Sequence, residues 1–234
     1  MRGESETMKK TIRTAFVDTI PVMTGYLVLG FGFGIVLRSS GYGILLAFLM
    51  SLFIYAGSMQ YVTVGLLTGG ASVITVALTT LMVNARHLFY GVSMLEKYEG
   101  TGKFKPYLIF ALTDETYSLV CVDNPNVRAE ERSRYFFFVS LLNHIYWVLG
   151  SVLGAVVGAL ISFNSEGIDF ALTALFITVF IEQWLSSKKH FSAIIGVSIS
   201  AISLLIFGAD KFLIPTMLLI ALILSLYKEE SSDD

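Results

Sequence analysis

Residues 14–37 read TAFVDTIPVMTGYLVLGFGFGIVL, a run in which Asp18 is the only charged residue. A helix that crosses the hydrocarbon core of a bilayer needs about 20 mostly apolar residues. The run therefore predicts a transmembrane helix. It lacks the small-residue cleavage pattern that ends a secretory signal, so we expect the mature chain to retain this helix.

The composition of the whole chain also indicates a membrane protein. Of 234 residues, 55% are hydrophobic and 15% are charged, and the mean hydropathy is +0.72. Soluble domains carry about 25% charged residues, and a soluble chain of this length could not bury so much apolar side chain. The formal net charge of -2 excludes a strongly basic surface for nucleic acid, and the single cysteine, Cys121, excludes an internal disulfide.

Seven further apolar runs follow the first. Their continuity favours helices, because the strands of a membrane β-barrel alternate apolar and polar residues over about ten positions. The predicted fold class is therefore all-α: a polytopic membrane bundle of seven or eight transmembrane helices, some of them broken. The last two runs form either a hairpin or one broken span. The seven runs cover residues 42–67, 71–95, 106–122, 134–162, 169–186, 191–208 and 212–227.

The loops predict the orientation of a single transmembrane domain over residues 1–234. Cytoplasmic loops carry an excess of Lys and Arg. With eight spans and a cytoplasmic N-terminal segment over residues 1–11, ten such residues lie inside and five outside. We therefore expect a cytoplasmic N-terminus, and a disordered acidic tail over residues 228–234. The five residues expected outside are Arg38, Lys97, Lys103, Lys105 and Lys211.

A weak internal similarity links spans 1–2 to spans 5–6. The glycine-rich segment 25–34 leads into a run that holds Gln60, and the glycine-rich segment 150–158 leads into a run that holds Gln183. Internal repeats are common in secondary transporters, where the substrate site lies at the repeat interface. The alternative is that glycine-rich apolar helices resemble one another by composition alone.

Ionisable residues inside the apolar runs are the clearest functional signal, because each costs a few kcal/mol at mid-bilayer. Asn84, Arg86 and His87 form a group that suits an anionic ligand such as a carboxylate, and His87 titrates near neutral pH. The alternative is that Arg86 only pairs with a membrane acid. Asp114 and Glu115 are suited to carrying a proton; the alternative is that they border a water-filled cavity.

Two further groups are weaker signals. A helix break at Gly57 and Ser58 would free backbone groups for a ligand beside Gln60, and Glu182 and Gln183 occupy the corresponding helix end in the second half of the chain. The alternative is a contact between small residues of packed helices.

A third group near the start of the fifth span is either a polar cluster inside the membrane or an aromatic anchor at the membrane surface. Tyr146 and Trp147 follow Asn143 and His144, and aromatic residues are enriched at membrane surfaces. The chain has no phosphate loop, no paired-cysteine or H-E-x-x-H metal motif and no nucleophile elbow. The sequence therefore predicts neither an enzyme nor a bound metal or cofactor.

Three motifs together resemble the AzlC family, the large subunits of bacterial and archaeal branched-chain amino acid exporters. The resemblance covers about residues 8–227. It implies export of leucine, isoleucine and valine across the cytoplasmic membrane of a prokaryote, and a small hydrophobic partner subunit of the AzlD type. Met59 and Phe89 depart from the family's usual small or aliphatic residues, which leaves the substrate side chain open. The motifs are Tyr55-Ala-Gly-Ser-Met-Gln60, Asn84-Ala-Arg-His-Leu-Phe-Tyr90 and Thr113-Asp-Glu-Thr-Tyr117.

The leading hypothesis is a secondary transporter that exports a branched-chain, apolar amino acid and is driven by protons. The alternative is a channel or passive pore for a small polar solute. The resemblance points to Ser58, Gln60, Asn84, Arg86, His87, Asp114 and Glu115. The expected substrate-binding residues are Ser58, Gln60, Asn84, Arg86, His87 and Gln183, and the expected proton-coupling residues are Asp114, Glu115, His87 and Glu182.

Overall fold

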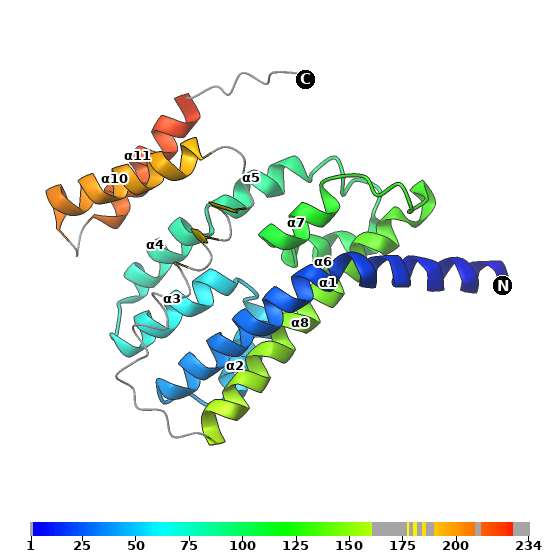
Figure 1. The fold of residues 1–234 in the computed structure, drawn as a ribbon, viewed down its shortest axis with the longest axis horizontal. Coiled ribbons are helices and arrows are strands. Elements are labelled where there is room, and N and C mark those ends of the chain that lie inside the picture. The colour runs from blue at the N-terminus through cyan, green and yellow to red at the C-terminus, as the bar shows by residue number, and fades with distance from the viewer. Residues whose placement is uncertain are drawn as a thin grey trace. The chain divides into compact units, whose positions relative to one another are not determined.

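The computed structural model describes residues 2–160, 190–208 and 212–226, with positions 177, 180, 181, 184 and 185. Every regular element in these residues is a helix, which agrees with the all-α prediction (Figure 1). Glu182, Gln183 and the tail 228–234 lie outside the described residues, so the expectations for them stay predictions. The chain divides into two compact units, Met1–Leu172 and Thr173–Asp234.

Two long helices, α1 (Arg2–Ser39) and α8 (Arg132–Leu160), pack along each other in the first unit. Within the described residues, the stretches Glu6–Ser39 and Ala129–Leu160 are long and apolar enough to cross a membrane. The sequence prediction of a spanning helix over residues 14–37 therefore agrees with the length and composition of α1.

Glycine brings the backbones of α1 and α8 into direct contact. A Cβ atom added to Gly34 would lie 2.1 Å from the carbonyl oxygen of Ser151, and one added to Gly154 would lie 2.0 Å from the carbonyl oxygen of Phe31. No side chain fits at such distances. Small residues allow this kind of close packing between membrane helices, so the two helices form a pair with no side chains between them at these points.

The rest of the first unit consists of shorter helices joined to this pair. They are α2 (Ile44–Phe53), α3 (Gly57–Thr68), α4 (Val73–Asn84), α5 (Arg86–Ser93), η1 (Gly102–Phe104), α6 (Lys105–Phe110), α7 (Asp114–Val120) and η2 (Ala129–Glu131).

Helices α2 and α3 form a hairpin, called the first hairpin, where the sequence predicts one span over residues 42–67. Nine residues extend about 13.5 Å along a continuous helix. Here the Nε2 of Gln60 donates a hydrogen bond to the Oγ of Ser51 at 3.2 Å, so the chain turns back between them. The turn is at residues 54–56, the tip of the first hairpin, directly before the predicted break at Gly57.

The first hairpin extends from the C-terminal end of α1 to the middle of the α1–α8 pair. At its tip, the ring of Tyr55 packs against the ring of Tyr26 with centroids 6.4 Å apart. Farther along α3, the Tyr61 hydroxyl donates to the carbonyl oxygen of Leu29 at 2.6 Å. Helix α3 therefore runs back along α1 toward the end where α2 begins.

Helices α6 and α7 form the second hairpin, where the sequence predicts a span over residues 106–122. The ring of Phe104 lies 4.7 Å from that of Phe137, and the ring of Phe110 lies 5.7 Å from that of His144. Helix α6 therefore runs along α8 from its N-terminal end to its middle. The chain turns at residues 111–113, the tip of the second hairpin.

Helix α7 returns to the end at which α6 begins, beside α5. Ser93 donates to the Tyr117 hydroxyl at 3.2 Å, and the Nζ of Lys97 donates to the Cys121 carbonyl oxygen at 2.7 Å. The Nζ of Lys97 also lies 2.9 Å from a carboxylate oxygen of Asp123. The loops on the two sides of the second hairpin therefore lie at the same end of the first unit.

This arrangement corrects one expectation from the sequence. Lys97 was expected on the opposite side of the membrane from the loop 123–134, yet it pairs with Asp123 in that loop. The hydrogen bond from Lys97, with the nearby charge of Arg132, lowers the pKa of Asp123 from its ordinary value. The expectation was wrong because a hairpin replaces the crossing helix.

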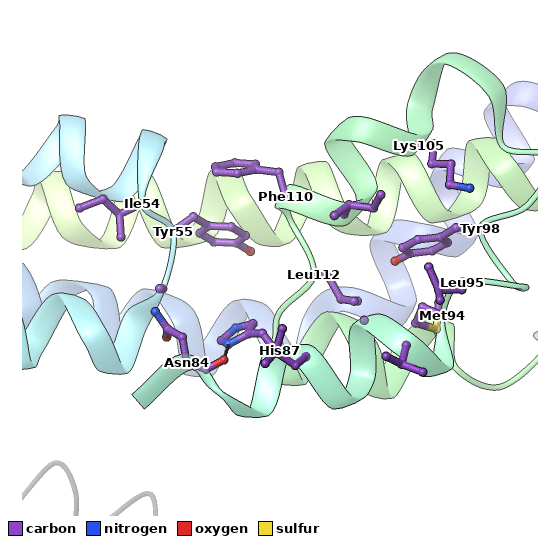
Figure 2. Close-up of a pocket in the computed structure, with 15 residues that line it drawn as sticks. Ile54, Tyr55, Asn84, His87, Met94, Leu95, Tyr98, Lys105, Phe110 and Leu112 are labelled. Carbon is purple, nitrogen blue, oxygen red and sulfur yellow. Dashed lines mark hydrogen bonds between the residues drawn. The ribbon is translucent and has the colours of Figure 1, made fainter. Parts of the chain in front are cut away.

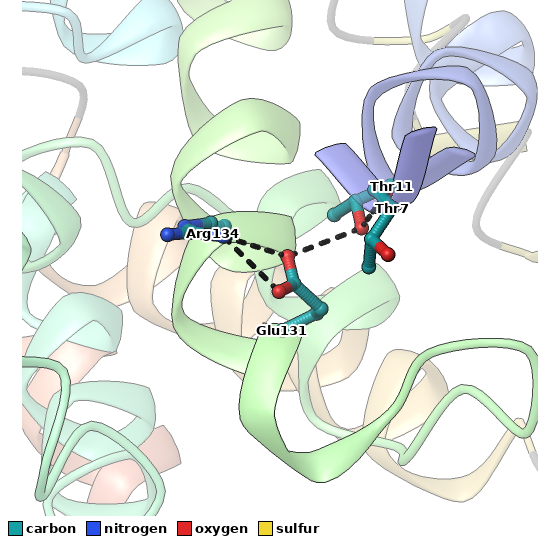
Figure 3. A network of polar contacts seen from close by, with 4 residues as sticks. All are labelled: Thr7, Thr11, Glu131 and Arg134. Atoms are coloured by element: carbon teal, nitrogen blue, oxygen red, sulfur yellow. Dashed lines mark hydrogen bonds and ion pairs between the residues drawn. The ribbon is translucent and has the colours of Figure 1, made fainter. Parts of the chain in front are cut away.

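A polar cluster joins α1 to the start of α8 at this end (Figure 3). The Thr11 hydroxyl donates to the carboxylate of Glu131 at 3.4 Å, and Arg134 donates to the same carboxylate at 3.1 Å. Glu131 is buried between the two helices. The buried carboxylate thus has both a neutral and a charged donor.

Helices α10 (Phe191–Phe207) and α11 (Leu213–Leu226) pack against each other in the second unit. Their bounds match the predicted runs 191–208 and 212–227. The predicted run 169–186 lies largely outside the described residues, so a span at this run and the internal repeat stay predictions.

We predict that Gly34→Ala will prevent correct packing of α1 on α8. Its Cβ would overlap the backbone of Ser151, and overpacking of this severity costs about 3 kcal/mol or more. Gly25→Ala is the matched control in the same helix, because nothing lies within 4 Å of its added Cβ. Thermal unfolding of the detergent-purified variants measures the difference. Equal stability of the two variants would contradict the close contact.

We predict that the loops flanking the second hairpin face the same side of the membrane. Single cysteines at Lys103 and Arg128, in a Cys121→Ser background, should react with a membrane-impermeant maleimide from one side, and a cysteine at Thr68 from the other. If each predicted run were one continuous helix, Thr68 and Arg128 would face one side of the membrane and Lys103 the other. The labelling of right-side-out and inverted vesicles distinguishes the two patterns.

Candidate functional site

Three interruptions of helical structure converge in the first unit. They are the tip at residues 54–56, the junction of α4 and α5 at Ala85, and the tip at residues 111–113. The rings of Tyr55 and Phe110 lie 6.3 Å apart at the two tips. Figure 2 shows these two residues on one side of a pocket and Asn84 and His87 on the other.

The pocket has a volume of about 500 Å³ and is mostly apolar. Polar groups of Tyr55, Asn84 and His87 lie at one end, and Tyr98 and Lys105 lie at the other (Figure 2). An apolar cavity with a few convergent polar groups is the usual form of a small-molecule site. The apolar lining includes Ile54, Leu88, Val92, Leu95, Ile109, Phe110 and Leu112.

The two adjacent acids lie at the second tip. Thr113 caps α7 by accepting a hydrogen bond from the Thr116 amide, so Asp114 and Glu115 occupy the first turn of the helix. Negative charge is favoured there by the helix dipole. The Tyr26 hydroxyl donates to Glu115 at 2.7 Å, and the Tyr90 hydroxyl donates to Asp114.

Tyr26 connects the second tip to α1. Its hydroxyl lies 2.6 Å from the Thr113 hydroxyl as well as 2.7 Å from the Glu115 carboxylate. Its ring also contacts Tyr55 of the first tip and Trp147 of α8. This buried tyrosine therefore contacts both tips and α8.

A buried network on α8 joins the two hairpins. The indole of Trp147 donates to Gln60 at 2.9 Å, and the Nε2 of His144 lies 3.2 Å from the carbonyl oxygen of Ser51. The Nδ1 of His144 lies 3.1 Å from the hydroxyl of Tyr107 in α6. Because a carbonyl oxygen only accepts, Nε2 carries a proton and donates to Ser51.

The structure brings most of the predicted residues into one region. Asn84 and His87 line the pocket, Asp114 and Glu115 lie at the adjoining tip, and Ser58 is the second residue of α3. The position of Arg86 is the first in α5, and its side chain lies outside the described part. The amide of Gln60 is fully buried and bonds to Trp147 and Ser51, so it joins α3 to α8 and α2, and its substrate-binding role stays a prediction.

Sequence reasoning missed the aromatic residues of this region. Tyr26 was not singled out, and Tyr55 and Tyr90 entered only as end residues of two motifs, although a phenol in mid-span carries a hydroxyl that needs a partner. The anchoring role expected for Tyr146 and Trp147 is wrong: both are buried in the protein, with Trp147 4% exposed. The adjacent polar pair of Asn143 and His144 could have indicated burial of Tyr146 and Trp147, because an anchor that faces lipid does not need polar neighbours.

The comparisons with known proteins identify the family. The model of the family described as AzlC protein matches residues 21–161. The Branched-chain amino acid transport protein AzlC of Bacillus subtilis is 46% identical over 217 residues, which cover 93% of this chain and 85% of that protein. An uncharacterized membrane protein of Haemophilus influenzae is 43% identical over 225 residues, covering 95% of this chain and 91% of that protein.

A more distant relative is also a membrane protein. The inner membrane protein YgaZ of Escherichia coli is 25% identical over 210 residues, covering 88% of this chain and 84% of that protein. No solved structure matches the chain significantly. The matched family segment runs from the middle of α1 to the end of α8 and includes both hairpins and the three converging interruptions, and the chain belongs to the AzlC family of membrane proteins.

Proposed function

We propose that this protein exports branched-chain, apolar amino acids across the cytoplasmic membrane and that protons drive the export. The observation that carries the proposal is the position of Asp114 and Glu115, two carboxylates at a hairpin tip beside a mostly apolar cavity of about 500 Å³. The name of the Bacillus subtilis relative, a branched-chain amino acid transport protein, supports the substrate class.

The proton-coupling role falls on the two carboxylates. Tyr26 donates to Glu115 and Tyr90 donates to Asp114, so each carboxylate has a tyrosine hydroxyl as a partner. Protonation of Glu115 removes the charge that holds the Tyr26 hydroxyl. Because Tyr26 contacts both tips, the loss of this interaction changes how the tips fit together, and this links proton binding to the opening of the site.

The substrate-binding role is assigned to residues that line the cavity or begin a helix beside it. Asn84 and His87 line the cavity, and Arg86, the first residue of α5, is included from the sequence as the proposed positive charge. Ser58 contributes from the start of α3. Gln183 and Glu182 would add the corresponding groups from the second half of the chain, under the proposed repeat of spans 1–2 and 5–6.

The basic end of the first unit is proposed to face the cytoplasm. The N-terminal part of α1 and the loops on both sides of the second hairpin meet at this end, and the opposite end carries Arg38. Cytoplasmic surfaces carry the excess of Lys and Arg. The basic residues at the proposed cytoplasmic end are Arg2, Lys9, Lys10, Arg13, Lys97, Lys103, Lys105, Arg128, Arg132 and Arg134.

We also propose that the chain works with a small hydrophobic membrane subunit of the AzlD type. Family membership supports this assembly. We propose in addition that residues 1–234 form a single membrane domain.

Uptake by inverted vesicles tests the function. Vesicles from cells that express the chain with its small partner should accumulate radiolabelled leucine when the vesicle lumen is made acidic, because protons then leave the lumen as leucine enters. Counterflow, the transient uptake of labelled leucine against unlabelled leucine inside, should occur in a carrier and not in a passive pore. Vesicles that show neither gradient-driven uptake nor counterflow would contradict the proposed function.

We predict that Glu115→Gln will abolish gradient-driven leucine transport and keep counterflow. The amide still accepts from Tyr26 but binds no proton, so the substrate step survives and the coupling step does not. Asp114→Asn tests the second carboxylate in the same way. Glu96→Gln, in the loop after α5, is the control and should transport as the wild type does. If both tip variants keep gradient-driven transport, the coupling role of these carboxylates is wrong.

A further inference from the structure

A chain of hydroxyl groups leads from Glu115 to α8. The Tyr26 hydroxyl lies 2.7 Å from the Glu115 carboxyl group and 2.6 Å from the Thr113 hydroxyl. Thr113 donates to the Thr116 hydroxyl at 3.0 Å, and the Nδ2 of Asn143 donates to the same oxygen at 3.0 Å. These contacts, called the hydroxyl chain, connect the second tip and α1 to the middle of α8.

The members of the hydroxyl chain beyond Glu115 are enclosed by protein. Thr116 and Asn143 are fully buried, and Tyr26 and Thr113 are also buried. An unmade hydrogen bond in such a place costs free energy. The Oδ1 of Asn143 has no partner in the part of the chain that the structure describes, so the bond to Thr116 is the one that orients this amide.

The single hydrogen of the Tyr26 hydroxyl cannot serve both of its contacts. A hydroxyl group donates one hydrogen bond, yet the two oxygen atoms beside the Tyr26 oxygen both lie at hydrogen-bond distance. One neighbour must therefore supply the hydrogen for its own contact. Thr113 can do so with its hydroxyl, and Glu115 can do so only when it is protonated.

The protonation state of Glu115 decides which arrangement forms. A charged carboxylate only accepts, so Tyr26 donates to it and Thr113 has to donate to Tyr26. A protonated carboxyl group donates to Tyr26 instead, Tyr26 donates to Thr113, and the Thr113 hydrogen is left for Thr116. The hydrogen bond from Thr113 to Thr116 therefore forms fully only when Glu115 is protonated.

This hydrogen bond affects how the second tip is held on α8. Thr116 is the residue of α7 that Asn143 binds. When Thr113 turns its hydrogen away, two buried oxygen atoms face each other at 3.0 Å with no hydrogen between them, which is unfavourable. Loss of the proton from Glu115 therefore weakens the packing of the second tip at its contact with α8.

We propose that the hydroxyl chain transmits the protonation state of Glu115 to α8, with Thr113 and Thr116 as positioning residues for proton coupling. Asn143 is the residue of α8 that receives the change. Each hydroxyl group keeps its own hydrogen and changes only its direction, and Glu115 alone gains or loses a proton. The inference rests on the proposed transport function and deepens it, because it names the contacts through which the carboxyl group acts on the fold.

Thr116→Val is the test, because it removes the hydroxyl group and keeps the shape of the side chain. Its backbone amide still donates to Thr113, so the cap of α7 is retained. In inverted vesicles with an acidic lumen, we expect accumulated leucine to fall about tenfold, which corresponds to about 1.4 kcal/mol of gradient energy no longer transferred. The half-saturation concentration and the rate of leucine counterflow should stay at the wild-type values, because Thr116 is not part of the cavity lining.

Two further variants separate the hydrogen bonds from the fold. Thr116→Ser keeps the hydroxyl group and should accumulate leucine as the wild type does. Asn143→Leu removes the donor on α8 with a side chain of similar size. It should lose accumulation as Thr116→Val does and keep counterflow.

Thr19→Val is the matched control. Thr19 is fully buried on α1, and its hydroxyl lies 3.3 Å from that of Tyr146, outside the hydroxyl chain. The same chemical change is therefore made at an equally buried site. This variant should lower the thermal unfolding midpoint about as much as Thr116→Val and leave leucine accumulation unchanged.

The outcomes separate this inference from the proposed function. Wild-type vesicles with neither accumulation nor counterflow would contradict the function itself. Wild-type accumulation in Thr116→Val would overturn only the role of the hydroxyl chain. Equal losses of accumulation in Thr116→Val and Thr19→Val, or no recovery in Thr116→Ser, would show that Thr116 is merely structural, which also overturns the proposal.

Discussion

The direct backbone contact between α1 and α8 is the constraint on which the first unit depends. Gly34 and Gly154 leave no room for a side chain between the two helices, and the contact fixes their spacing and their register. Both hairpins are attached to this pair, because α2 follows the end of α1 and the second hairpin precedes the start of α8. A shift of one long helix against the other would therefore displace both tips.

The lengths of the hairpin helices explain why the chain turns back. Helix α6 has 6 residues and α7 has 7, which extend about 9 Å and 10.5 Å. The hydrocarbon core of a bilayer is about 30 Å thick, so neither helix crosses it. Non-helical backbone at membrane depth is tolerated where it is buried in protein or lines a cavity, and both tips contribute residues to the lining of the pocket or its border.

The sequence predicts the helical class well and the path of the chain poorly. Hydropathy measures only how many apolar residues follow one another. The run 42–67 has the same hydropathy whether it forms one spanning helix or two shorter helices. The glycine at position 57 did indicate the break. The return of the chain depends on contacts such as the one between Gln60 and Ser51, and no local pattern contains such contacts.

In the candidate site, the charged residues could be predicted from the sequence and the aromatic residues could not. Charged residues are improbable in lipid, so Asp114 and Glu115 stand out in the sequence. Tyrosine is ordinary in an apolar run, so Tyr26 and Tyr55 do not, and only the fold brings them together between the tips.

The histidine on α8 ties the two hairpins together. His144 bonds to Ser51 in the first hairpin and to Tyr107 in the second, while α8 itself is held against α1 by glycine contacts. A hairpin that withdraws from the pocket breaks its own bond to His144 and leaves the other in place. The buried imidazole of His144 then lacks one hydrogen bond, which is unfavourable. Withdrawal of both hairpins at once would leave two unmade hydrogen bonds, so displacement of one hairpin at a time costs less free energy.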